Sequence, residues 1–368
     1  MAAACGVIAV VAVSGAIALR DKPFRKPPPE IAAVPQRDPS PTPAVDRAPA
    51  ATPTPAQPSK PQAPATAAGG PQIIHVEPQD GDASGNGAVV IRDPSAVGQN
   101  LRVAHLPDQA LIENGPAGPL PVRSADGRRP FDVYARPWSG ARGARVAIVI
   151  GGLAVSQTGT QAAIAKLPPE VTLAFAPQGN SIGRWMQEAR RQGHEIVMQV
   201  PLEPFDYPNV NPGRNTLTVG ASARENVKSL LWALSRTTNY TTVMNYMGAR
   251  FTADTAAMEP VMAELAKRGL GYLDDGSSAR SVASDLALKD RVPLAVGDAI
   301  IDGTQDRGAI LGKLDELERI ARAKGFAVGT GSAFDVTVDA VASWVAEARK
   351  RGIEIVPISA VAADPERR

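Results

Sequence analysis

From residue 145 onward the sequence predicts an α/β fold in which helices cover a parallel sheet. Apolar runs of strand length alternate about seven times with amphipathic segments, and several of these segments end in basic residues followed by glycine. The strands are nearly continuous apolar runs, which is typical of parallel strands buried on both faces. A sheet of this kind forms either a (β/α) barrel or a doubly wound sheet.

Eight apolar segments are expected to form the strands: 146–150, 171–176, 196–202, 242–247, 270–273, 294–296, 326–328 and 353–358. Helical spacing of apolar residues lies between them, most clearly in the stripes that begin at Ile182, Val227 and Met258. Ser222, with Glu225 three residues later, predicts a capping box at the start of the second of these helices.

The ends of four helices are marked by basic residues followed by glycine. The four sites are Arg190 to Gly193, Lys267 to Gly269, Lys324-Gly325 and Lys350 to Gly352. Cations are favourable at the negative end of a helix, and glycine readily adopts the left-handed conformation of the cap. Each site therefore predicts a helix C-terminus, and a predicted strand follows each one.

Polar residues gather at the predicted carboxyl ends of the strands, where both architectures bind their ligands. They are Gly151-Gly152, Pro177-Gln178, Glu203, Asp206, Tyr207, Asn245, Arg250, Asp274, Asp275, Asp298, Asp302 and Gly331-Ser332. Paired carboxylates at such an edge can act as general acid and base if their surroundings separate their pKa values. The alternative is structural, because aspartates such as Asp274 and Asp298 also cap helices and anchor loops.

Histidine is not available at these strand ends. His75 and His105 precede the α/β region, and His194 lies before a strand, at the opposite edge of the sheet. A metal site with two histidines and an aspartate is therefore not expected, and neither is a Ser-His-Asp triad. The chain also has no Walker loop and no dinucleotide fingerprint.

Several sequence runs resemble the divergent polysaccharide deacetylase family of bacterial envelope proteins. They are VTLAFAP (171–177), GHEIVMQVPLEPFDYP (193–208), VMNYMGARFT (243–252), LDDGSS (273–278) and RGIEIVPISA (351–360). The resemblance covers about residues 143–362. It implies a distorted (β/α)7-type barrel with parallel strands, an extracytoplasmic location and a glycan ligand. In active relatives with this fold, a metal held by an aspartate and two histidines activates water to remove an N-acetyl group.

Three positions depart from the pattern of active relatives. Gly151-Gly152 stand where such relatives carry an Asp-Asp pair, Tyr246 stands where some have histidine, and Gly331-Ser332-Ala333 replaces a Gly-His-Pro. Neither glycine, tyrosine nor serine offers the imidazole or aspartate ligand that zinc prefers. These departures from the family pattern therefore predict that this chain does not bind the zinc of active relatives. We predict no metal ligands and no other cofactor.

Two functions remain open. The first is a catalytically silent protein of carbohydrate metabolism that binds a glycan, with Glu203, Asp206, Asn245, Arg250 and Asp298 as substrate-binding residues and Asp274 and Asp275 contributing hydrogen bonds. The second is a hydrolase that removes acetyl groups from an envelope polysaccharide without the usual metal site. In that case Asp274 or Asp275 is the base and Arg250 stabilises the oxyanion.

The first 142 residues divide into three segments. Residues 1–22 hold an uncharged apolar run followed by basic residues, which predicts a membrane anchor or, if it is cleaved, a signal segment. Residues 23–71 contain 15 of the 34 prolines and read as a disordered extended linker. Residues 72–142 are expected to form an irregular arm packed on the barrel domain, 143–363. The predicted location is the inner membrane with the barrel in the periplasm, or secretion after cleavage.

The net positive charge of the chain comes from residues 1–71. The 368-residue chain has a formal net charge of +2, but residues 1–71 hold seven basic and four acidic residues, which leaves 32 basic and 33 acidic residues elsewhere. The balanced remainder offers no basic stripe for phosphates, so nucleic-acid binding is not expected. With Cys5 as its only cysteine, the chain forms no internal disulfide. Basic residues after the apolar run oppose the expected orientation, and a start codon upstream of Met1 would explain this.

Overall fold

The computed structural model describes residues 105–367. The predicted anchor, the proline-rich linker and residues 72–104 of the predicted arm lie outside the described residues. Within 105–367, no helix is both long enough and apolar enough to cross a membrane.

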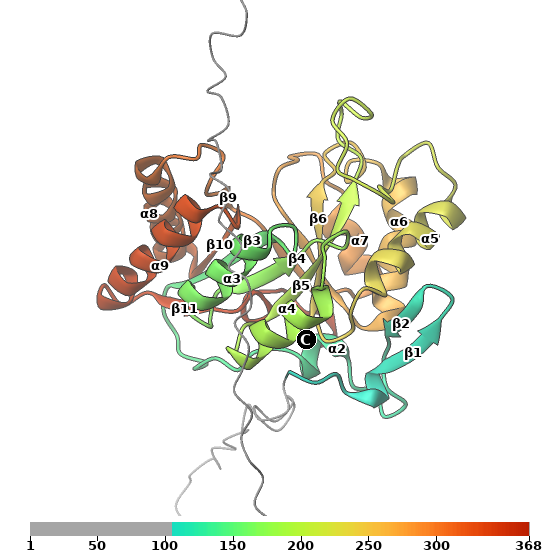
Figure 1. The fold of residues 1–368 in the computed structure, drawn as a ribbon, viewed down its shortest axis with the longest axis horizontal. Coiled ribbons are helices and arrows are strands. Elements are labelled where there is room, and N and C mark those ends of the chain that lie inside the picture. Colours follow the sequence, from blue (N-terminus) through green and yellow to red (C-terminus); the bar gives the residue numbers. More distant parts are fainter. Residues whose placement is uncertain (1–104, 368) are drawn as a thin grey trace, which may run out of the picture. The chain divides into compact units, whose positions relative to one another are not determined.

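The centre of the domain is a curled sheet of nine strands that pair only in parallel, which confirms the predicted (β/α) barrel class (Figure 1). Its strands are β3 (Arg145–Leu153), β4 (Thr172–Phe175), β5 (Ile196–Leu202), β6 (Thr242–Met247), β7 (Gly271–Asp274), β8 (Leu294–Val296), β9 (Ala299–Ile300), β10 (Phe326–Ser332) and β11 (Glu354–Val356). Their order is β8-β7-β6-β5-β4-β3-β10-β9, and β11 pairs with the first residues of β3. Eight strands lie where the sequence predicts them, and β9 is the addition.

The two ends of this sheet are joined by only two residues, Gly297 and Asp298. The Gly297 amide donates a hydrogen bond to the Asp274 carbonyl at the end of β7, over 2.8 Å. The Asp298 amide donates to the Val328 carbonyl in β10, over 2.7 Å. A link this short keeps β8 within about 11 Å of β9, because successive Cα atoms are about 3.8 Å apart. The sheet must therefore curl round on itself, as a barrel does.

Seven helices follow strands of this sheet: α3 (Gln157–Lys166), α4 (Ile182–Arg191), α5 (Ala223–Leu234), α6 (Thr255–Arg268), α7 (Ala283–Asp290), α8 (Arg307–Lys324) and α9 (Asp335–Lys350). The predicted capping box of Ser222 and Glu225 is confirmed at the start of α5. Gly269 and Gly325 take the left-handed conformation after α6 and α8, which confirms these predicted helix ends. Both helices end in basic residues that complement the negative helix end.

Two apolar clusters lie on the two faces of the sheet. The larger contains Val146, Ile148 and Ile150 of β3 together with the buried sides of the helices. The smaller contains residues such as Ala147, Val149 and others from alternate positions of the strands, and no residue of the covering helices. Since successive strand side chains point to opposite faces, this second cluster fills the barrel interior.

The described part of the arm packs at the end of the barrel where the strands begin (Figure 1). It contains a short 3-10 turn (Gln109–Leu111), a hairpin of β1 (Ile112–Gly115) and β2 (Gly118–Pro121), and α2 (Pro130–Val133). Hydrogen bonds attach it to the ends of α5 and α6: Ser235 Oγ donates to the Ala117 carbonyl over 3.0 Å, and Arg268 Nη1 donates to the Pro121 carbonyl over 2.8 Å.

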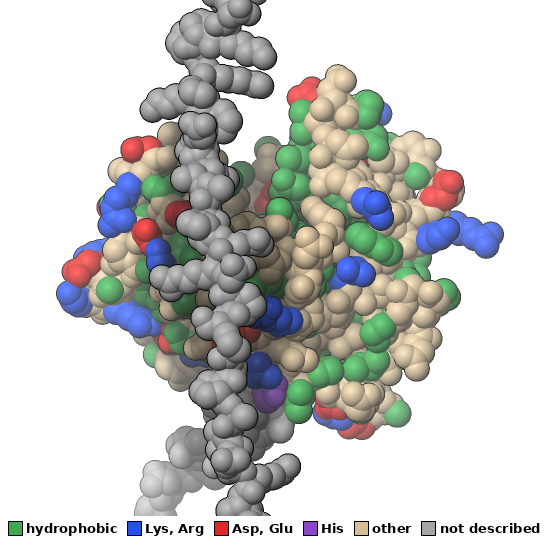
Figure 2. Space-filling view, in the orientation of Figure 1, with side chains coloured by type: hydrophobic (Ala, Val, Ile, Leu, Met, Phe, Trp, Pro, Cys, Tyr) green, Lys and Arg blue, Asp and Glu red, His purple; other side chains and the backbone are tan. Residues whose placement is uncertain are grey.

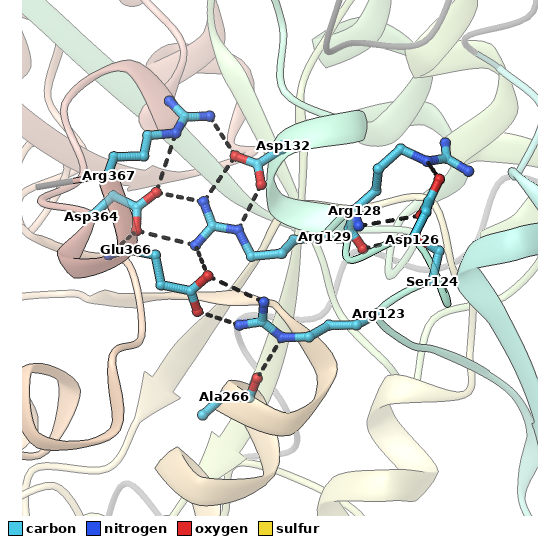
Figure 3. A network of polar contacts seen from close by, with 10 residues as sticks. All are labelled: Arg123, Ser124, Asp126, Arg128, Arg129, Asp132, Ala266, Asp364, Glu366 and Arg367. Carbon is cyan, nitrogen blue, oxygen red and sulfur yellow. Dashed lines mark hydrogen bonds and ion pairs between the residues drawn. The ribbon is translucent and has the colours of Figure 1, made fainter.

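A buried ion-pair network joins this arm to the C-terminal residues (Figure 3). Arg129, only 4% exposed, contacts Asp132 through Nε at 2.6 Å and Asp364 through Nη2 at 2.5 Å. Arg123 pairs with Glu366, and Arg367 pairs with Asp132. Burial opposes the charge on Arg129, but the hydrogen bonds that it donates to Asp364 and Asp132 raise its pKa above the ordinary value. The network therefore attaches the arm to residues 364–367 through ion pairs.

Candidate functional site

A pocket of about 590 Å³ opens at the carboxyl ends of the strands, which is the edge where the sequence predicts a ligand. Its volume lies within the range usual for small-molecule sites. The lining residues come from or follow β3, β4, β5, β6, β7, β9 and β10, so nearly the whole ring of strands contributes. No residue of 105–142 lines it. The described part of the arm therefore does not complete the groove.

Gln199 of β5 lines the pocket and lies against Gly151 and Gly152 of β3. The Gly152 amide donates a hydrogen bond to Gln199 Oε1 over 2.9 Å. A Cβ atom at Gly151 would lie only 2.6 Å from Gln199 Nε2. The carboxamide of Gln199 therefore occupies the space that a side chain at position 151 would need.

Asn245 and Asp275 form a bonded pair on one wall. The Asp275 amide donates to Asn245 Oδ1 over 2.9 Å, and Asn245 Nδ2 donates to the Met247 carbonyl over 2.7 Å. Asp275 Oδ1 accepts from the Ser277 amide over 2.9 Å. Burial raises the pKa of Asp275 above its ordinary value, while contacts with Ser277 and Asn245 act in the opposite direction. Both residues line the pocket, Asn245 from β6 and Asp275 from the loop after β7, and these hydrogen bonds orient their side chains.

Asp274 lies beside Asp275 in the chain but does not line the pocket. Its Oδ1 accepts from the Gly276 amide over 3.0 Å, and its Oδ2 accepts from the Ser281 hydroxyl. These bonds hold the loop between β7 and α7. The alternative structural role that the sequence left open for Asp274 is thus the one its contacts describe, as a loop anchor rather than a helix cap.

Glu203, Arg250 and Asp206 belong to the neighbouring loops and also stay outside the pocket. The buried carboxylate of Glu203 accepts from the Val219 amide over 2.6 Å and from Arg250 Nη1 over 2.8 Å. Asp206 is exposed on the loop that follows β5. The Glu203–Arg250 pair therefore connects the loops after β5 and β6. The charge of Arg250, which the hydrolase hypothesis needs to stabilise an oxyanion, is already paired with Glu203.

Asp298 is directed to a different part of the domain. Its carboxylate accepts from the Val328 amide over 2.8 Å and from Lys324 Nζ over 2.5 Å, where α8 turns into β10. The physical reason is the short strand β9, which begins one residue later and continues the sheet. Asp298 thus precedes a strand as well as following one, and it does not line the pocket.

Asp302 and Gln199 line the pocket, although neither is among the residues predicted to bind substrate or to act in catalysis. Asp302 Oδ2 accepts from the Ser332 amide over 2.6 Å and from the Thr337 hydroxyl over 3.0 Å. The sequence placed Asp302 near a strand end, but β9 is too short to give a periodic signal. Gln199 lies inside β5 rather than at its end, so the strand-end rule does not identify it.

The rim of the pocket is apolar and partly exposed to solvent. Tyr246, Phe334 and Ile300 line it with 37%, 42% and 44% of their surfaces exposed. In Figure 2, hydrophobic side chains border the hollow between the α8–α9 side and the raised loop after β5. Exposed apolar patches around a concave polar site are typical of binding surfaces.

The donor set of this pocket does not fit a zinc centre. It offers oxygen atoms from Asp275, Asp302, Asn245 and Gln199, and its described lining contains no histidine or cysteine. Zinc sites in proteins are built mainly from cysteine and histidine, with carboxylates added. Between residues 105 and 367, no group of three or more His, Cys, Asp or Glu side chains is placed to hold a metal ion.

A model of the divergent polysaccharide deacetylase family matches residues 148–362. The crystal structure of an uncharacterized protein from Agrobacterium tumefaciens C58 is 56% identical, with a TM-score of 0.65, over 66% of this chain and 99% of that one. An uncharacterized protein of Haemophilus influenzae is 26% identical over 46% of this chain and 60% of its own length. The uncharacterized protein YibQ of Escherichia coli is 22% identical over 47% of this chain and 53% of its own. The match thus spans little more than half of these last two relatives.

Proposed function

Because the chain belongs to the divergent polysaccharide deacetylase family, we propose that its pocket binds a saccharide without hydrolysing it. The observation that carries the proposal is the composition of the pocket. Fixed amide and carboxylate groups lie beside exposed aromatic rings, and no zinc ligand set is present in the described lining. An envelope location, expected from residues 1–71, is part of the proposal. Cell fractionation that finds the full-length chain only in the cytosol would contradict that part.

The polar groups suit the hydroxyl groups of a sugar. Asn245 and Gln199 already hold hydrogen bonds to backbone groups, so their planar amides are oriented before a ligand arrives. Preorganised groups of this kind lose little conformational entropy on binding. Asp275 and Asp302 add carboxylate oxygens, which form charge-assisted hydrogen bonds with hydroxyl donors.

The aromatic rim suits the apolar faces of the same ligand. Sugar rings present C–H groups on their faces, and an exposed ring can cover them while the hydroxyl groups point to polar partners. Both rings belong to the lining: Tyr246 lies near the end of β6, and Phe334 follows β10. Their positions at the ends of separate strands allow a saccharide to be held between two apolar contacts.

We expect Tyr246→Ala and Phe334→Ala each to weaken saccharide binding about tenfold, since an aromatic anchor at a binding site contributes about 1–2 kcal/mol. Isothermal titration of the full-length protein with a panel of soluble envelope-type oligosaccharides measures this. Leu288→Ala is the matched control, because Leu288 is 60% exposed on α7 and does not line the pocket. Absence of binding to every oligosaccharide, or equal loss in the Leu288 variant, would contradict the proposal.

A hydrolase is the second candidate, and the environment of Asp275 favours it. Its carboxylate is nearly buried, lines the pocket, and has a pKa raised by burial, as is common for groups that exchange protons in catalysis. Under this alternative the wild-type protein releases acetate from N-acetylated oligosaccharides, and Asp275→Asn abolishes the release while retaining binding. We expect no acetate release from either protein; enzymatic acetate detection over a long incubation decides between the two candidates.

A further inference from the structure

We propose that the pocket selects a saccharide that carries a free primary amine. This inference rests on the proposed function, because it names the class of saccharide that the same pocket takes. Asp275 and Asp302 are the only Asp or Glu residues in its described lining, which contains no Lys, Arg or His. The lining is thus polar and concave, with two acidic side chains and no basic one.

Neither carboxylate is neutralised by the protein. Asp275 and Asp302 are 9% and 7% exposed, and within residues 105–367 neither forms an ion pair with a basic side chain. Their neighbours at the strand ends differ in this respect: Glu203 pairs with Arg250 at 2.8 Å, and Asp298 pairs with Lys324 at 2.5 Å. A nearly buried charge without a counter-charge is unfavourable, so a cation that enters the pocket is stabilised.

The hydrogen bonds of Asp302 leave one oxygen for the ligand. Both bonds, from the Ser332 amide and the Thr337 hydroxyl, end on Oδ2. They come from β10 and the first turn of α9, so the carboxylate is fixed in orientation by two elements of the barrel. Asp275 is fixed in a similar way by the Ser277 amide. The two groups are therefore placed as rigid acceptors rather than as mobile surface charges.

An ammonium group is the ligand chemistry that complements these acceptors. It supplies a positive charge and three hydrogen-bond donors on one small atom. An N-acetylated sugar is neutral at the same position, and a uronic acid or a phosphorylated sugar brings a negative charge that both aspartates repel. Among saccharides, the pocket should therefore favour amino sugars and disfavour acidic ones.

The reaction class that supplies such a ligand is amide hydrolysis. Water cleaves the amide bond between the acetyl carbon and the nitrogen of an N-acetylated sugar. The acetyl group leaves as acetate, and the nitrogen stays on the sugar as a primary amine. A protein that prefers the amine would bind the product of a deacetylase rather than its substrate. That preference agrees with a deacetylase-like barrel whose pocket lacks the donor set for zinc.

Titration of the full-length protein with glucosamine oligomers, N-acetylglucosamine oligomers of the same length and uronic-acid oligomers at neutral pH tests this inference. We expect the amine form to bind at least tenfold more tightly than the N-acetylated form. Asp302→Asn and Asp275→Asn should each reduce that preference about three- to tenfold, since an isosteric amide keeps the hydrogen-bond acceptor but removes the charge. Added salt should reduce the preference as well.

Glu316→Gln is the matched control, because it removes one negative charge from a partly exposed position on α8 that does not line the pocket. Thermal melting of each variant checks that it is folded, and the two aspartate variants serve as independent tests. Equal affinity for the amine and N-acetylated forms, or an unchanged preference in both folded aspartate variants, would overturn the inference and leave the proposed function standing. Failure to bind any saccharide would instead contradict the proposed function.

Discussion

Replacing Arg129 with methionine is expected to lower the free energy of unfolding by about 3–5 kcal/mol, the usual cost of removing one partner from a buried ion pair. The guanidinium is 4% exposed and lies between Asp132 and Asp364, at 2.6 Å and 2.5 Å (Figure 3). Without it, the two carboxylates keep their charges in a largely buried site. Denaturation by urea, followed by circular dichroism, measures the change.

Arg128→Met is the control for this prediction. Arg128 is the neighbouring residue, and its side chain is 41% exposed while it pairs with Asp108 and Asp126. Exposed pairs contribute about 0–1 kcal/mol, so the control should be nearly neutral. Losses of similar size in the two variants would show that the network in Figure 3 does not stabilise the fold through burial.

The pH dependence of the same variants gives a second readout. Burial opposes the ionisation of Asp364, but the hydrogen bond and charge of Arg129 lower its pKa below the ordinary value. Stability from a lowered carboxyl pKa is present above the pKa of the unfolded chain and is lost as the pH falls through the lowered, folded value. The difference in the free energy of unfolding between wild type and Arg129→Met should therefore become smaller as the pH falls below about 4.

Replacing Gly276 with alanine is expected to destabilise the domain by about 2–4 kcal/mol, through backbone strain and overpacking. Gly276 has φ of 75°, in the left-handed region that favours glycine. An added Cβ would lie 2.2 Å from the carbonyl oxygen of Gly297, which is a backbone atom and cannot rotate away. The loop after β7 would have to separate from the β8–β9 link.

Gly352→Ala separates the two causes. Gly352 has φ of 81°, but a Cβ there would meet no atom within 4 Å, so only the backbone strain applies. We expect about 1 kcal/mol for this control. Equal losses in the two variants would show that the contact with Gly297 is unimportant. Since Gly276 follows Asp275 directly, saccharide binding by the folded Gly276 variant should also fall.

Much of the fold is predictable because its signals are local. Continuous apolar runs mark the strands, helical spacing marks the helices, and a basic residue before glycine marks a helix end; the left-handed Gly269 and Gly325 show the last signal directly. These signals do not reveal how strands are ordered, so the residues alone left a barrel and a doubly wound sheet open. The resemblance to a family favoured the barrel. The two-residue link between β8 and β9 shows how the sheet curls.

The candidate site is only partly predictable for a related reason. The rule that ligands bind at strand ends identifies the edge of the sheet where the pocket opens, but it does not say where each side chain points. Asp274 and Asp275 are adjacent, yet only Asp275 lines the pocket, because Asp274 holds its own loop through Gly276 and Ser281. Asp298 was assigned to the same edge because the two-residue strand β9 has no recognisable pattern.

The sequence by itself determined which side chains are available: none of its three histidines follows a predicted strand, and glycines stand at 151 and 152. Tertiary structure alone decided which groups share a pocket. It placed Gln199 in the space beside Gly151, paired Glu203 and Asp298 with cations, and left Asp275 and Asp302 without one in the described residues. The reason is that charge pairing depends on distances between loops far apart in the chain, and no local pattern encodes those distances.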